Sequence, residues 1–102
     1  MTADDFELDA LAVEAAKRVG LRGTITAEYA RFRTLKATWE RGADFMNIRL
    51  SHYLQYAPEA IVMEALVNII RDALGQKPLR PSEAMATWLA ENRHKWTKEA
   101  GQ

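Results

Sequence analysis

Apolar residues in the first twenty positions recur at helical spacing and form one stripe, made by Leu8, Leu11, Ala12, Ala15 and Val19. The end signals agree with a helix. Thr2 and Asp5 form a start that resembles a capping box, and Gly20 follows the last apolar position. We therefore expect an amphipathic helix that packs its apolar stripe on the rest of the chain.

From residue 24 the apolar period changes to two, which is the pattern of half-buried strands. Alternation predicts one strand at residues 24–29 and another at residues 46–51, and residues 35–39 form a weaker strand candidate between them. The turn from the second strand into the third is expected at Arg41-Gly42-Ala43-Asp44. These two strands should then form an antiparallel hairpin.

Residues 58–74 predict a helix that is apolar over most of its circumference. Pro58 suits the first turn, and Gly75 ends the helix. Its polar residues share one strip of about 100°; they are Glu64, Asn68, Arg71 and Asp72. Such a helix needs cover on two sides, from the sheet and from another helix or a second subunit.

A last helix follows a linker that contains Pro78 and Pro81. Its large apolar residues fall on one side of the helix; they are Met85, Trp88, Leu89 and Trp96. The tail, about residues 97–102, is expected to fray. We predict one α+β domain over residues 1–102, in which three helices cover a small, mainly antiparallel three-stranded sheet in the order helix, three strands, two helices.

Composition narrows the functional classes. The chain has 102 residues, of which 48% are hydrophobic, and this is enough for one modest core. Its 14 basic and 14 acidic residues balance, so no overall field favours nucleic acid or an anionic membrane. The absence of cysteine and of a signal peptide pattern indicates a cytoplasmic protein. Apolar runs fall far short of the roughly 20 residues that span a bilayer, and we expect no cofactor.

Residues 24–74 resemble the core of a known peptidase group. Trp39 follows a basic and polar segment, residues 46–51 read Met-Asn-Ile-Arg-Leu-Ser, and Leu54 precedes Ala57-Pro58-Glu59, which opens the apolar helix. This order resembles the SprT-like and minigluzincin metallopeptidases. In those families a Trp strand, an edge strand of the type I-x-L, a leucine and "AP" or "PE" lead into a helix that carries HExxH. The resemblance implies that residues 58–74 stand where those enzymes bind zinc.

The zinc motif itself is missing. The only histidines, His52 and His94, lie outside residues 58–74. If Pro58 is aligned with the proline of the peptidase pattern, the zinc-ligand positions fall among residues 67–73. A second alignment, or register, places Met63-Glu64-Ala65-Leu66-Val67 over HExxH, and of the motif residues only the glutamate is then present. Helical zinc peptidases need two histidines four residues apart. The resemblance therefore implies a degenerate, non-catalytic relative.

The function that we favour is a non-catalytic protein-interaction or oligomerising module, with a homodimer or another protein as its partner. Four apolar residues of the 58–74 helix follow steps of four, three and four residues, which is the seam that one helix offers another. The expected interface consists of Met63, Val67, Ile70 and Leu74, with Trp88 from the last helix.

Two alternatives belong to other classes. Arg31, Arg33 and Arg49 lie near aromatic residues in the strand region, as in proteins that bind nucleic acid on a sheet. Glu28 and Glu40 lie in the same region, and we consider nucleic acid the weaker hypothesis. The other alternative is a hydrolase with an unconventional site, for which no residue set can be named. We interpret Glu64, His52 and His94 as structural or surface residues.

Overall fold

The computed structural model describes residues 3–100, and the side chains of residues 7–96. Its elements are α1 (Ala3–Val19), β1 (Thr24–Ala30), β2 (Ala37–Arg41), β3 (Phe45–Ser51), the short 3-10 helix η1 (His52–Tyr56), α2 (Glu59–Ala73) and α3 (Glu83–Ala100). The predicted α+β class and the order of helices and strands are confirmed, with η1 as an addition. Strand β2 begins two residues later than expected. Thr2, part of the expected capping start, lies outside the described residues.

The three strands form one sheet in the order β1-β3-β2, with β3 in the centre. Strand β3 pairs antiparallel with β2, and the Gly42 amide donates to the Phe45 carbonyl at 3.0 Å to close the predicted hairpin. Strand β3 also pairs with β1, but parallel. The sheet is therefore mixed rather than mainly antiparallel. After β1 the chain leaves one strand position empty and forms β2 beyond it, and β3 then fills the position between β1 and β2.

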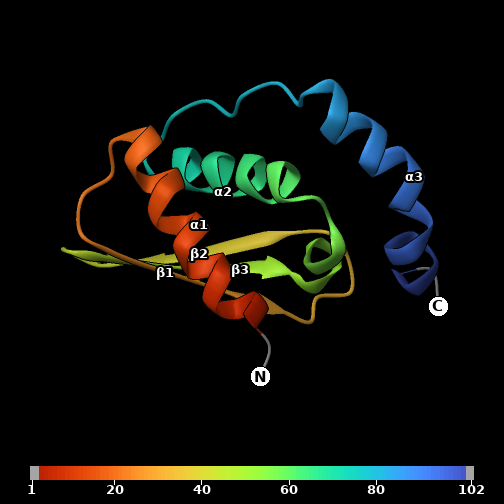
Figure 1. Ribbon diagram of the computed structural model, residues 1–102, viewed down its shortest axis with the longest axis horizontal. Coiled ribbons are helices and arrows are strands. Elements are labelled where there is room, and N and C mark those ends of the chain that lie inside the picture. The colour runs from red at the N-terminus through yellow and green to blue at the C-terminus, as the bar shows by residue number, and fades with distance from the viewer. Residues whose placement is uncertain (1–2, 101–102) are drawn as a thin grey trace.

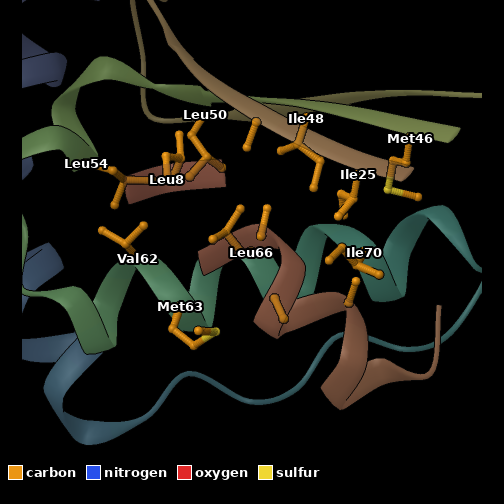
Figure 2. Close-up of a cluster of buried hydrophobic side chains, with 14 of the residues drawn as sticks. Leu8, Ile25, Met46, Ile48, Leu50, Leu54, Val62, Met63, Leu66 and Ile70 are labelled. Carbon is orange, nitrogen blue, oxygen red and sulfur yellow. The ribbon is translucent and has the colours of Figure 1, made fainter. Parts of the chain in front are cut away.

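The core lies between one face of the sheet and the two helices α1 and α2 (Figures 1 and 2). Strand alternation directs Ile48 and Leu50 of β3 into this layer, where they meet Leu66 and Ile70 of α2 and Leu8 of α1; all five are fully buried. Burying one such side chain contributes about 1.5–3 kcal/mol relative to leaving it exposed. This layer is the main source of stability.

Helix α3 does not cover the sheet, which corrects the expectation that all three helices do. It lies at one end of the molecule, and the linker before it arches over α2 (Figure 1). Trp96 of α3 packs its ring against Tyr53 of η1 at 5.4 Å between centroids and stacks with Trp88 at 5.8 Å. The tail expected to fray overlaps the end of α3, which runs to Ala100, and residues 101–102 lie outside the described part of the chain.

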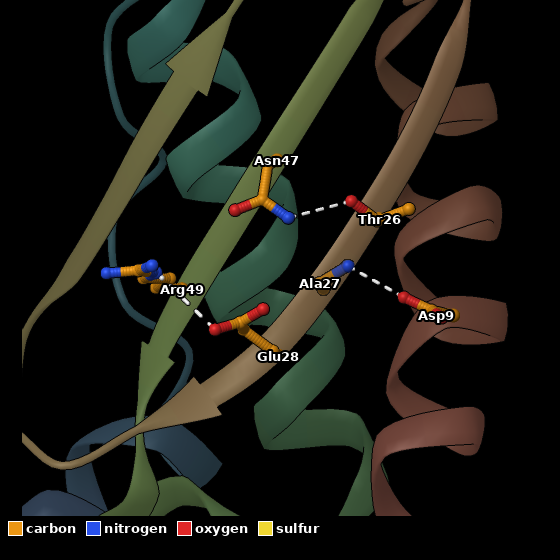
Figure 3. A network of polar contacts seen from close by, with 6 residues as sticks. All are labelled: Asp9, Thr26, Ala27, Glu28, Asn47 and Arg49. Atoms are coloured by element: carbon orange, nitrogen blue, oxygen red, sulfur yellow. Dashed lines mark hydrogen bonds and ion pairs between the residues drawn. The ribbon is translucent and has the colours of Figure 1, made fainter.

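Helix α1 contacts the outer edge of β1. Asp9 of α1 accepts a hydrogen bond from the backbone amide of Ala27, at 2.7 Å between Oδ1 and N (Figure 3). Unpaired amides on an edge strand invite pairing with another chain, and this carboxylate occupies one of them. The bond also ties α1 to the sheet by a contact that is independent of its apolar stripe.

We expect Asp9→Ala to lower the free energy of unfolding by about 1–2 kcal/mol, because the substitution removes a hydrogen bond to a charged acceptor in a part-buried place. Urea unfolding measures the change. Asp9→Asn keeps an acceptor oxygen and should lose less. Glu14→Ala, on the exposed side of α1, should stay within about 0.5 kcal/mol of the wild type. Equal losses for Asp9→Ala and Glu14→Ala would contradict this role for Asp9.

Candidate interaction surface

The polar strip of α2 holds the linker that leads to α3. Arg71 donates from Nε to the carbonyl of Lys77 at 2.9 Å, and one turn earlier Asn68 accepts from the amide of Leu79 at 3.0 Å. The linker therefore runs back along α2 in the opposite direction, on the side away from the sheet (Figure 1). Residues three and four apart on a helix share one face, which is why this strip can hold an extended segment.

Glu64 continues this row and positions the start of α3. Its carboxylate accepts from the Ser82 amide at 2.8 Å and from the Ser82 hydroxyl at 2.6 Å. The same hydroxyl accepts from the Met85 amide at 3.0 Å, so Ser82 is the N-cap of α3. The interpretation of Glu64 as a hydrogen-bonded surface carboxylate is confirmed.

Two grooves border α2 and meet at Ala60, which lines both of them. The first lies between α1, α2 and the linker, and its apolar lining includes Val19, Ala60, Met63, Val67 and Leu79. The second lies between the start of α2 and α3, and its lining includes Pro58, Ala60, Ile61, Ala84 and Trp88. We refer to the two grooves together as the trench.

The trench contains three of the five residues expected at an interface. Met63 and Val67 line the first groove, and Trp88 lines the second. Figure 2 shows Met63 on the opposite side of α2 from the side chains that point to the sheet.

Ile70 is 0% exposed, so its assignment to an interface is wrong: α1 packs beside α2 and, with the sheet, covers this part of the expected seam. Leu74 is half-buried against the core and does not line the trench.

Sequence reasoning missed several apolar residues of the trench, among them Leu79 and Ala60. Leu79 is 50% exposed on its rim, and Ala60 lies where the two grooves meet. Leu79 stands alone between Pro78 and Arg80 in an otherwise polar linker, and this was the available signal. The position of Ala60 carries no such signal, because the surroundings of an alanine depend on which elements pack beside it.

The basic residues considered for nucleic acid do not gather on one surface. Arg31 and Arg33 are exposed in the loop after β1, whereas Arg49 lies on the open face of the sheet. There its Nε contacts the carboxylate of Glu28 at 3.4 Å (Figure 3). Tyr29 packs against the core from the other face, so it offers no stacking platform beside Arg49. This arrangement does not favour a nucleic-acid interface.

The described part of the chain also contains no cluster of three or more His, Cys, Asp or Glu side chains that could hold a metal ion. His52 lies with Nδ1 at 3.3 Å from the Ala30 carbonyl and its ring against Tyr53, which fits a packing role. His94 is exposed on α3. Within residues 3–100, none of the helices combines the length and the apolar character needed to cross a bilayer.

Comparisons with protein-family models, with curated proteins and with solved structures find no match to this chain. The resemblance to the SprT-like peptidases rests only on the sequence positions quoted above.

We expect Glu64→Ala to weaken the start of α3 more than the rest of the fold. The substitution removes both acceptors that hold the capping residue Ser82 in place, and a hydrogen bond to a charged group contributes about 1.5–3 kcal/mol. Amide hydrogen exchange at Met85 should accelerate, while exchange in β3 should change little. Glu40→Ala, an exposed glutamate on β2, is the matched control. Unchanged exchange at Met85 in Glu64→Ala would show that the strip does not position α3.

Proposed function

We propose that this chain is a non-catalytic protein-interaction module that docks its partner in the trench. The observation that carries this proposal is the grouping of Met63, Val67 and the exposed Leu79 in one groove beside a second groove that Trp88 lines, with Ala60 lining both. Methionine and aromatic side chains are enriched at protein interfaces, and apolar channels of this kind accept helices.

The proposal includes a relation to the minimal zinc peptidases, supported by the residues around Trp39 and Pro58. In the second register, Met63 and Val67 stand at the two histidine positions. Both line the first groove. In this interpretation apolar side chains take the place of the metal ligands, and the surface that would have served a zinc site serves a partner instead. Neither a hydrolase site nor a nucleic-acid surface gains a comparable observation.

We expect Val67→Lys to remove partner binding without unfolding the chain. Wild type, Val67→Lys and Val13→Lys are immobilised separately, and the proteins retained from a native lysate of the source organism are quantified by mass spectrometry. Val13 is 41% exposed on α1 and does not line the trench, which makes it the matched control. Partners that bind the trench should remain on wild type and Val13→Lys and be lost from Val67→Lys.

The same experiment includes a test of position. Chemical crosslinks from a retained protein should reach Lys77, whose carbonyl bonds to Arg71 beside the trench, rather than Lys36 in the loop before β2. Cooperative thermal unfolding of each variant shows that the fold persists. Retention of the same proteins on all three chains would exclude the trench as the interaction surface.

A separate prediction concerns catalysis. We expect the purified protein to carry no stoichiometric zinc and to hydrolyse no peptide, because a lone carboxylate or histidine does not hold a catalytic zinc tightly. Elemental analysis after dialysis measures the zinc content, and a fluorogenic peptide mixture measures hydrolysis. About one zinc per chain, together with a chelator that lowers thermal stability, would overturn the non-catalytic assignment.

A further inference from the structure

The two ends of the trench carry opposite charge. Arg18 and Arg71 line the first groove with one carboxylate, that of Glu64, which already accepts two hydrogen bonds from Ser82. Arg18 also contacts Glu14 on its own helix at 3.5 Å, an exposed pair of the kind that contributes little. Among the residues that line the first groove, two guanidinium groups outnumber one carboxylate, and Glu14 beside Arg18 does not line it.

Two carboxylates line the second groove. Glu83 and Glu91 project from α3 beside Trp88, and among the described residues that line this groove none is basic. Both glutamates are exposed. The trench thus runs from a positive end near Arg18 to a negative end near Glu91, with the small side chain of Ala60 between them.

We infer that the occupant of the trench is the trench of a second copy of this chain, related by a two-fold axis near Ala60. A two-fold rotation reverses the trench, so the positive end of each copy faces the negative end of the other. An interface of this symmetry places the same patch on both partners and must be self-complementary. Opposite charges at the two ends make the trench self-complementary, because the two-fold axis creates two equivalent pairings of a positive end with a negative end. The inference rests on the proposed function, since it names the partner of that surface.

The apolar residues agree with this arrangement. Leu79 is half exposed and lines the first groove, which in the proposed dimer faces the second groove of the other copy, lined by Trp88. Ala60 at the centre allows the two copies of α2 to approach closely, because the distance between packed helices depends on the side chains at the contact. Both copies would bury apolar surface that a single chain leaves open.

Charge also disfavours other occupants. A partner of uniform sign, such as a strongly basic helix, would be attracted by one end of the trench and repelled by the other. The same holds for a surface of uniform negative charge. A second copy avoids both repulsions.

The test uses two charge reversals, Arg18→Glu and Glu91→Lys. Both positions are solvent-accessible, with 58% of the Arg18 side chain exposed, so the fold should persist. Light scattering and sedimentation over a concentration series should show wild type at about twice 11.6 kDa at high micromolar concentration. Each single variant creates two like-charge contacts per dimer, and we expect its dimer dissociation constant to rise about tenfold or more.

An equal mixture of the two variants provides the decisive measurement. In a heterodimer, the glutamate introduced at position 18 of one chain would face the lysine introduced at position 91 of the other, while the remaining native arginine and glutamate face each other at the opposite end. The mixture should therefore dimerise more tightly than either variant alone, and the double variant should approach the wild type. A misfolded single variant could not be rescued by mixing. Added salt should reduce these differences.

Three results would overturn the inference: a wild type of single-chain mass at high micromolar concentration, single variants that dimerise as tightly as the wild type, or a mixture no tighter than its components. Failure of the proposed function is distinguishable from these. If wild type is monomeric but Val67→Lys still loses the captured proteins, the trench binds a different partner. If Val67→Lys loses nothing, the interaction surface itself is wrong.

Discussion

The burial of α2 is the constraint on which the rest of the structure depends. This helix presents apolar side chains over most of its circumference, and the sheet can cover only one side of it. Leu66 and Ile70 meet the sheet layer and are fully buried. Helix α1 packs alongside α2, and the linker lies over the side that faces away from the sheet (Figure 1). What these neighbours leave open is the trench.

Hydrogen bonds from the polar strip of α2 hold the linker in place at three successive points. Arg71, Asn68 and Glu64 bond in turn to the backbone near Lys77, Leu79 and Ser82. A polar strip on a helix can thus be covered by an extended segment, because each side chain satisfies a backbone group that would otherwise need water. This arrangement also delivers Ser82 as the cap of α3, so the same three side chains set where the last helix begins.

The positions that resemble a zinc site have structural roles in this chain. Asn68 and Arg71, which fall among the expected ligand positions of one register, hold the linker, and Met63 and Val67 of the other register line an apolar groove. None of these side chains can deprotonate a metal-bound water. At these positions, hydrogen bonds to the linker and apolar groove contacts stand where the resemblance would place zinc ligands.

The sequence by itself determined the helices, the strands and most of their ends, because apolar periodicity and helix-ending residues are local signals. Strand alternation predicted which residues of β1 and β3 face the core, and Gly75, with a φ of 75°, ends α2. Only the tertiary structure decided the parallel pairing of β1 with β3, and the bond that Asn68 makes to Leu79, eleven positions away. The spacing of the expected seam could not reveal that the sheet layer would bury Ile70 while Val67 would line a groove, because burial depends on the neighbours that each face of a helix meets.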